Sequence, residues 1–213
     1  MAPFIFTDLG TILAWEGLDL DLMSYGEPLT AAAIEEADLV VVLPVHDYPH
    51  EYANADLYDE EWAAAEVSVL VEYVEDGGLL VLTNSATRLG PFAYPRESNE
   101  DLGDLNLVAS EFGLEYLAPI ESSEAEVVGE HDLVDGVDTL AMVSGNGVAL
   151  SPVGVDDLVL AQADGALVAV LVAHGDAGGE VVALGDIGML VSQGGEPSNF
   201  RFWQNLAQYA ASR

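Results

Sequence analysis

The stretch DLVVVLPV, residues 38–45, decides the fold. It is too short for a helix and rich in β-branched residues, so it predicts a strand buried on both faces, as in a parallel sheet covered by helices. Residues 60–76 repeat apolar side chains at helical spacing, and Gly77-Gly78 follows at the position of a left-handed helix cap. The run LLVLT, residues 79–83, is a second buried strand. Together they predict a strand–helix–strand unit of an open α/β sheet.

The segments before this unit predict four short elements. They are a first strand at residues 3–6, a helix at 8–15, a sheet-edge strand at 18–23 and a helix at 30–37 with Thr30 as its cap. The edge strand is inferred from leucines that alternate with aspartates, which is the period of a strand with one exposed face.

The segments after the unit turn from helix to short β runs. A helix at 102–112 and a strand at 114–117 precede an acidic segment, 118–138, that has no regular pattern. Five β runs follow, at 140–143, 148–150, 158–161, 167–173 and 181–184, with a turn at Asp176-Ala177-Gly178-Gly179 and a last helix at 198–211. No repeat or linker divides the chain. We expect one domain, 1–213, with a doubly wound, mostly parallel, flavodoxin-like α/β sheet and a β-rich C-terminal part.

The composition fits a soluble globular domain. The chain has 213 residues, 51% of them hydrophobic, and no apolar run approaches the roughly 20 residues that span a bilayer. The first residues lack the features of a signal peptide. A domain excised from a longer protein is an alternative interpretation of the chain. The cellular compartment is not predicted. The absence of cysteine excludes a thiolate nucleophile and a Cys-based metal site.

The charge balance is extreme, with 38 acidic residues against four arginines and a net charge of −34. Such a surface repels nucleic acid and anionic membranes, so neither is expected as a partner. The acids are scattered, which indicates a solvated acidic shell and a salt-adapted, halophilic source, because salt screens self-repulsion. Calcium binding is the alternative, although no stretch has the EF-hand loop pattern.

Five segments carry a family resemblance. They are ADLVV (37–41), VEYVEDGGLL (71–80), HDLVDGV (131–137), GEVVALGD (179–186) and NFRFWQNL (199–206). Their order resembles the class I glutamine amidotransferase-like fold, and more closely its non-catalytic branch in uncharacterised bacterial proteins, gliding-motility transport accessory proteins and an intraflagellar-transport subunit. The resemblance implies a fold and no reaction.

The catalytic residues of that family have no counterpart here. Catalytic members place a cysteine at the turn after the strand equivalent to 79–83 and a histidine after the last core strand. This chain has Thr83-Asn84-Ser85 and Gly185-Asp186-Ile187-Gly188 at these places. We therefore expect a non-enzymatic binding or assembly module without cofactor. A hydrolase that uses Ser85 is a weaker reading, since its base would have to come from His46, His50 or His174.

Polar residues follow the core strands at their carboxyl ends, where open α/β sheets bind ligands. Asn84, Ser85, Arg88 and Asp186 predict a site for a small polar ligand or a segment of a protein partner. The alternative is a closed surface with Arg88 in a local salt bridge. The cluster His46, Asp47 and His50 predicts a divalent-metal site. The alternative interpretation is that these histidines are exposed loop residues without a ligand. His131 is interpreted as structural, and the oligomeric state is left open.

Overall fold

The structure is a computed structural model that describes residues 7–19, 21, 23, 27–43, 62–84, 100–142, 146–151, 154, 157–190 and 197–213. Its helices are α1 (Thr7–Trp15), α2 (Ala31–Ile34), α3 (Ala64–Glu75), α4 (Glu100–Ala109) and α5 (Pro197–Ala211), with 3-10 turns η2 (Ser110–Phe112), η3 (Asp132–Val134) and η5 (Ile187–Leu190). Its strands are β1 (Val40–Val42), β2 (Leu79–Thr83), β3 (Tyr116–Glu121), β4 (Glu124–Val127), β5 (Thr139–Ala141), β6 (Asn146–Leu150), β7 (Leu158–Ala163), β8 (Ala166–His174) and β9 (Gly179–Leu184).

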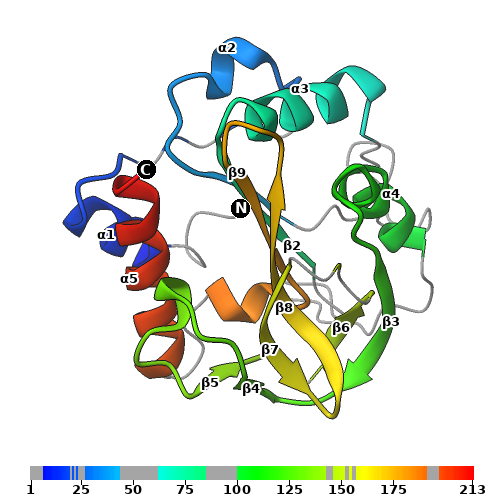
Figure 1. The fold of residues 1–213 in the computed structure, drawn as a ribbon, viewed down its shortest axis with the longest axis vertical. Coiled ribbons are helices and arrows are strands. Elements are labelled where there is room, and N and C mark those ends of the chain that lie inside the picture. Colours follow the sequence, from blue (N-terminus) through cyan, green and yellow to red (C-terminus); the bar gives the residue numbers. More distant parts are fainter. Residues whose placement is uncertain are drawn as a thin grey trace, which may run out of the picture.

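The described strands form one curled, mixed sheet in the order β1-β2-β9-β8-β7-β4-β5, with β6 on β8 and β3 on β6 (Figure 1). Only the pairings β1–β2 and β2–β9 are parallel. The other described pairings are antiparallel, so the prediction of a mostly parallel, flavodoxin-like sheet is not confirmed. The β-rich C-terminal part is confirmed, because short runs joined by tight turns pair as antiparallel neighbours.

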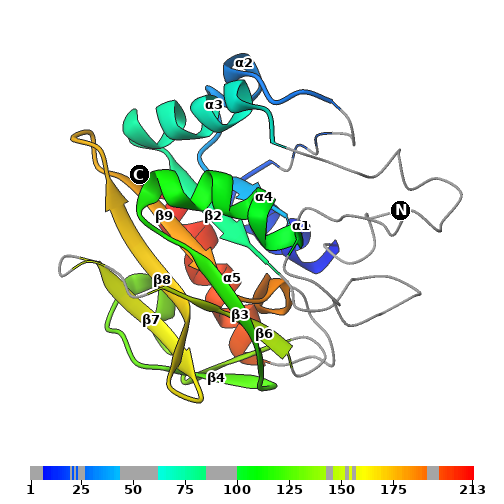
Figure 2. The same ribbon diagram turned by 90° about the vertical axis from the view of Figure 1, so that its right-hand side faces the viewer.

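Helices cover both faces of the parallel part of the sheet, with α1 and α5 on one side and α3 and α4 on the other (Figures 1 and 2). Two hydrophobic cores lie on the two faces of the sheet, and successive residues of β2 point alternately into one and the other. Leu79 and Val81 pack with α5 residues such as Trp203. Leu80 and Leu82 pack instead with α3 and α4. A strand that is apolar at every position is the consequence of burial on both faces.

The turn after α3 packs directly against the β8–β9 hairpin. Gly77 has φ +102° and ends α3, as the sequence predicts. A Cβ added at Gly179 would lie 1.7 Å from the Val74 carbonyl oxygen, and one at Gly175 would lie 3.0 Å from Glu75 Cα. These glycines are needed because main chain meets main chain here. The segments 71–80 and 179–186, which carry the family resemblance, therefore form one packing contact.

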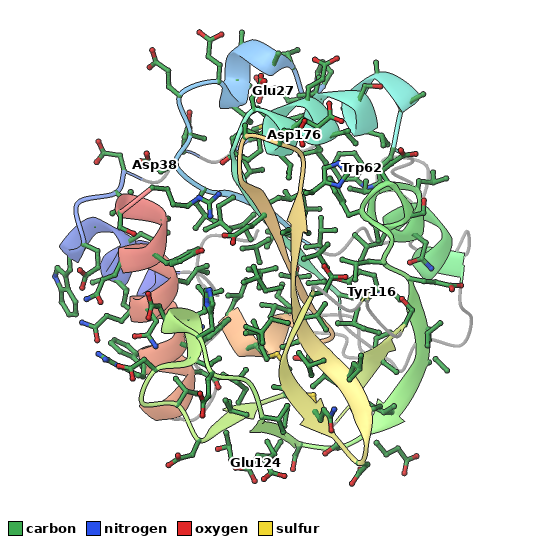
Figure 3. The ribbon with its side chains drawn as sticks, in the orientation of Figure 1. Glu27, Asp38, Trp62, Tyr116, Glu124 and Asp176 are labelled. Atoms are coloured by element: carbon green, nitrogen blue, oxygen red, sulfur yellow. The ribbon has the colours of Figure 1, made fainter. Side chains whose placement is uncertain are left out.

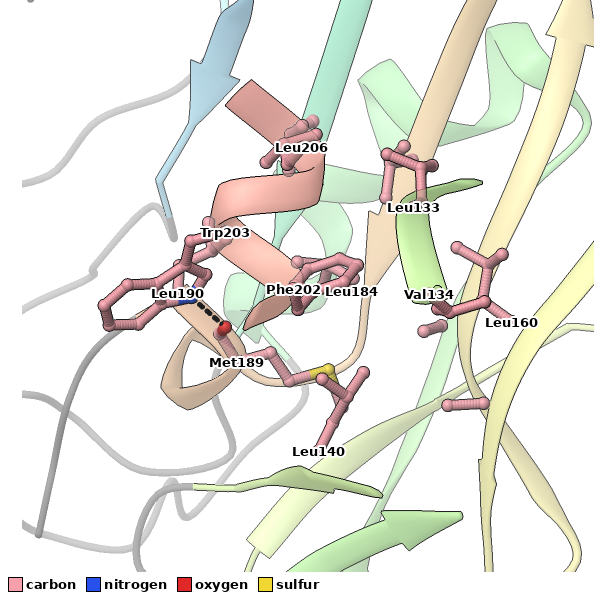
Figure 4. Packing of buried hydrophobic residues seen from close by; sticks show 14 of the residues in the cluster. Leu133, Val134, Leu140, Leu160, Leu184, Met189, Leu190, Phe202, Trp203 and Leu206 are labelled. Atoms are coloured by element: carbon pink, nitrogen blue, oxygen red, sulfur yellow. Dashed lines mark hydrogen bonds between the residues drawn. The ribbon is translucent and has the colours of Figure 1, made fainter. Parts of the chain in front are cut away.

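Helix α5 is tied to the sheet through its polar side chains as well as its apolar face. Trp203 Nε1 donates to the Met189 carbonyl oxygen (Figure 4). Asn205 Nδ2 donates to the carbonyl oxygens of Leu133 and Asp135. The resembling segments 131–137 and 199–206 thus bind each other. His131 caps η3 by accepting from Leu133 N at 3.2 Å, in agreement with its structural interpretation.

Asparagine side chains close two edges of the sheet. Asn106 of α4 binds both main-chain groups of Tyr116 on β3, at 2.7 and 2.9 Å. Asn199 of α5 does the same for Ala141 on β5, at 2.8 and 3.1 Å. Each amide imitates one residue of a neighbouring strand, because it offers one donor and one acceptor side by side.

Several local predictions are wrong. The segment 118–138 is not irregular, since it contains most of β3, all of β4 and η3. Described residues of 18–23 form no strand, and Thr30 precedes the four-residue helix α2 without a side-chain capping bond. The first predicted strand, 3–6, lies outside the described residues. In the part of the chain that the structure describes, no helix is both long and apolar enough to cross a membrane.

The described acidic residues differ in exposure, since Asp186 is fully buried and others lie at the surface. Glu27, Glu124 and Asp176 are exposed at the periphery of the molecule (Figure 3).

Candidate functional site

The predicted ligand site begins where β1, β2 and β9 end side by side. Val42 pairs with Leu82, and Thr83 pairs with Leu184. Thr83 Oγ1 donates to the Val42 carbonyl oxygen at 2.9 Å, which joins the last residues of β1 and β2. The ladder then continues past the strands, since Asn84 N donates to Leu184 O at 3.2 Å and Ile187 N donates to Asn84 O at 2.6 Å.

Asp186 turns the chain from β9 into η5. Its Oδ1 accepts from Gly188 N, which is the local bond that favours aspartate at the start of such a turn. All four residues of η5 are buried, and Asn199 Nδ2 donates to the Gly188 carbonyl oxygen at 2.8 Å. The turn that follows β9 is therefore fixed from both sides.

The polar side chains at these strand ends are buried. Thr83 and Asp186 are 0% exposed, and Asn84 is 1% exposed. The structure brings Asn84 and Asp186 together, because Ile187 N, one residue past Asp186, binds Asn84 O. It shows them inside the protein and not on an open surface.

Five of the predicted site residues lie outside the described residues. They are Ser85 and Arg88 of the ligand site and His46, Asp47 and His50 of the metal site. Both sites therefore stay predictions. Among the residues that the structure does describe, no group of three or more histidine, aspartate or glutamate side chains is arranged to hold a metal ion.

His174 cannot be the base for a nucleophile that follows β2. His174 pairs with Gly179, at the amino end of β9. Asn84 is bonded to Leu184 at the other end of β9, and Leu184 pairs with Ala169, which precedes His174 by five residues on β8. At the rise of a β-strand these two levels are about 17 Å apart. His174 instead packs edge-on against Phe112, at 5.0 Å between ring centroids. His131 packs edge-on against Tyr209, at 5.2 Å between ring centroids.

Tyr116 lies beneath the same strand ends. Its hydroxyl donates to the Leu82 carbonyl oxygen at 2.9 Å, and its side chain is 1% exposed. Burial raises the pKa of the Tyr116 hydroxyl far above its usual value, because the phenolate has no solvation there. It is a fixed neutral donor and not an acid for catalysis.

The amino ends of the same strands hold a cluster that the sequence analysis missed. Arg213 donates to the carbonyl oxygens of Gly77 and Gly178 and forms an ion pair with Glu180. Its guanidinium carbon lies 5.5 Å from the centroid of the Tyr209 ring. No local pattern could reveal this cluster, since Gly77 and Arg213 are 136 residues apart.

Comparison with solved structures shows that this fold is shared. The chain superimposes on the mmIFT52 N-terminal domain with a TM-score of 0.67 at 15% identity, covering 99% of this chain and 91% of that one. It superimposes on the Salmonella typhimurium cytoplasmic protein STM3548 with a TM-score of 0.64 at 17% identity, covering 96% and 86% of the two chains. The cytoplasmic protein STM1381 from Salmonella typhimurium LT2 gives 0.61 at 17% identity, covering 95% and 86%.

These likenesses agree with the intraflagellar-transport-type relative that the sequence indicates, and at such identities they concern the fold alone. No protein-family model and no curated protein matches the sequence. The glutamine amidotransferase-like assignment is not confirmed by the comparisons.

Proposed function

We propose that this chain is a non-catalytic binding or assembly module on a glutamine amidotransferase-like scaffold, with a protein as its partner. One observation carries the proposal. Where catalytic amidotransferases keep a cysteine and a histidine, the described side chains Thr83, Asn84 and Asp186 are at most 1% exposed. Thr83 and Asp186 also bind main-chain groups of neighbouring residues. A nucleophile needs access to substrate and an adjacent base, and these residues offer neither.

The superposition on the mmIFT52 N-terminal domain is compatible with this proposal at the level of the fold. It supplies no partner for this chain.

The absence of catalysis is tested with purified protein. We expect no ammonia release from glutamine and no hydrolysis of an activated ester above the buffer rate. Activity that survives further purification and disappears in Ser85→Ala would contradict the proposal. His174→Ala is the matched control, since His174 lies at the opposite end of the sheet from Asn84.

Partner binding is tested with a carbodiimide, which joins carboxylates to amines without a spacer. The chain has no lysine, so every product that is not formed through its own terminal amine must contain an amine of another molecule. We expect a discrete product in an extract of the source cells that weakens in Arg88→Ala and persists in Arg96→Ala. Many products of different size that form equally with both variants would show that other proteins are attracted only by the negative charge of the chain.

A site for a small ligand is the second candidate function. The hydrogen bond from Ile187 N to Asn84 O favours it, because this bond holds Asn84 next to the turn that begins at Asp186. The site would be bounded by Asn84, Ser85, Arg88 and Asp186, with the Arg88 guanidinium suited to a carboxylate or phosphate. Arg88→Ala should then abolish the thermal stabilisation that a carboxylate or phosphate ligand produces in the wild type. Equal stabilisation of both proteins would remove this candidate.

A metal site at His46, Asp47 and His50 has its own test. Zinc titration of the apoprotein should show stoichiometric binding that is lost in His46→Ala and in His50→Ala. Binding that survives both substitutions would place the ion elsewhere on the acidic surface.

We also propose that the protein is adapted to salt. With a net charge of −34, thermal midpoints should rise as sodium chloride goes from the low-millimolar to the molar range, because screening reduces repulsion among carboxylates. A flat response would show that the acids are spaced too widely to matter. A steep response to millimolar calcium alone would indicate specific ion sites instead.

A further inference from the structure

The amino ends of β2 and β9 enclose a guanidinium group. Arg213 Nη2 donates to Gly77 O at 3.1 Å and also to Gly178 O, while Nη1 forms the ion pair with Glu180 Oε2. The plane of the group lies near the face of Tyr209. Two carbonyls, a carboxylate and an aromatic face are the set of contacts that a planar, forked cation satisfies best.

The acceptors belong to rigid main chain and not to the segment that carries the arginine. Gly77 and Gly178 have φ of +102° and +83°, and a Cβ on Gly77 would lie 3.2 Å from Ala177 O, so the two turns are in contact. The direction of both carbonyls is thus fixed by the α3–β2 turn and the β8–β9 hairpin. Such a preorganised arrangement loses little entropy when it binds a cation.

The carboxylate is also held in place. Tyr209 Oη donates to Glu180 Oε2 at 2.7 Å. Burial raises the pKa of the Tyr209 hydroxyl, so it remains a neutral donor beyond the pH range in which a free tyrosine does. The side chains of Arg213 and Glu180 are 20% and 18% exposed, so the ion pair is partly shielded from water.

Tyr73 is a neighbour on which Arg213 acts electrostatically. Burial raises the pKa of Tyr73 at the end of α3, and the charges of Arg213 and Asp38 act on that pKa in opposite directions. Without the Arg213 side chain, the two carbonyls and Glu180 would leave a concentrated negative potential that attracts a cation.

We propose that the amino ends of β2 and β9 form a guanidinium-binding site, occupied in cis by Arg213, that takes an arginine side chain of another protein when Arg213 leaves. Lysine is a poor substitute, because its single ammonium cannot contact both carbonyls and the carboxylate in one plane. The site lies at the opposite end of the sheet from Asn84, so it is independent of the function proposed above.

Chemical rescue tests the site. Millimolar ethylguanidinium should raise the thermal midpoint of Arg213→Ala by about 2–4 °C near saturation, the shift expected for modest binding in a chain of this size. Ethylammonium and sodium at equal ionic strength should give a clearly smaller rise. In the double variant Glu180→Gln/Arg213→Ala the difference between the two organic cations should shrink. Equal rises with ethylguanidinium and ethylammonium in Arg213→Ala would overturn the proposal.

Arg201→Ala is the matched control. Arg201 lies on α5, which ends two residues before Arg213. The Arg201 side chain is 41% exposed and reaches Asp135 at 3.4 Å on the open surface. Its removal should leave no guanidinium-specific effect. A rescue as large as that of Arg213→Ala would show general binding of guanidinium to an acidic protein, and would equally overturn the site.

The wild-type protein supplies a second measurement if Arg213→Ala does not fold. The chain has four arginines, so the side-chain nitrogen signals of arginine-labelled protein are few. We expect the side-chain N–H signals of one arginine to be protected from exchange with water. These signals should be absent in Arg213→Lys, which assigns them to Arg213. A short peptide with a single arginine should reduce this protection, and the same peptide with lysine should not. Protection that is unchanged by excess arginine peptide would overturn the proposal.

Discussion

The two ends of the parallel strands are closed by different means. At the amino end, main chain meets main chain, as the 1.7 Å between a Cβ on Gly179 and Val74 O shows. At the carboxyl end, backbones also meet, since a Cβ on Gly185 would lie 2.1 Å from Val148 O, but buried polar side chains add further bonds there. Thr83 joins β2 to Val42 O of β1, and Asp186 holds the turn after β9 through Gly188 N.

The two ends differ in the amino-acid substitutions that they tolerate. A steric contact between two backbones has no room for any side chain, since neither backbone can move without breaking its sheet or helix. A hydrogen bond from a side chain can be lost at the cost of one unsatisfied buried group. The amino end thus fixes how α3 sits on the hairpin, while the carboxyl end has side chains that can be exchanged for other chemistry on the same fold.

The largest effect is expected at Gly179. Gly179→Ala should lower the free energy of unfolding by more than about 3 kcal/mol, because the new methyl group overlaps the Val74 carbonyl at the end of α3. Chemical denaturation measures this loss.

Gly165→Ala is the control for that variant. Gly165 has φ +80° but no atom within 4 Å of an added Cβ, so it reports backbone strain alone, about 1 kcal/mol. Equal losses at the two glycines would mean that the α3–hairpin contact is loose, and the contrast between the two ends would disappear.

A smaller effect is expected at the carboxyl end. Asp186→Ala should cost about 2 kcal/mol, because Gly188 N loses its acceptor in a fully buried turn. Asp186→Asn keeps an oxygen at the same place and should cost about 1 kcal/mol or less. If the alanine variant unfolds at the same denaturant concentration as the wild type, side-chain hydrogen bonds do not hold this end.

The smallest effect at neutral pH is expected at Tyr116. Tyr116→Phe removes the bond to Leu82 O and should cost about 1 kcal/mol. Burial raises the pKa of Tyr116 in the folded state, so its contribution is present below the unfolded pKa of about 10 and is lost as pH rises above it, by about 1.4 kcal/mol per pH unit. Stability of the two proteins should therefore converge within about one pH unit above 10.

Urea midpoints of both proteins between pH 8 and 11 check this expectation. Parallel curves over the whole range would contradict it, because they would mean that Tyr116 titrates equally in the folded and unfolded chains.

The sequence by itself determined most of the central unit, although β1 is shorter than the predicted stretch 38–45 in the described residues and only its Val42 is buried. Strand β2 has the predicted bounds, and α3 ends at the predicted glycine cap. These elements could be predicted because burial on both faces leaves a continuous apolar run, and because a left-handed cap restricts the residue type locally. The rule that parallel strands end at one edge also predicted the proximity of Asn84 and Asp186.

Strand β4 could not be predicted in the same way. Glu124 and Glu126 are exposed and Ala125 is its one fully buried residue, so the local pattern is acidic and weak. Its partners β5 and β7 supply the missing information through pairing, which depends on residues that are distant in the sequence. The same reason explains why the predicted parallel sheet is mixed.

Only the tertiary structure decided which polar residues meet. It buried Thr83, Asn84 and Asp186, separated His174 from them, and brought Arg213 onto Gly77, Gly178 and Glu180. Periodicity and capping report on neighbours within a few turns, whereas these contacts arise from the order in which distant strands join the sheet. The physical reason is that side-chain hydrogen bonds and ion pairs form between groups that packing has already placed together, and packing is a property of the whole chain.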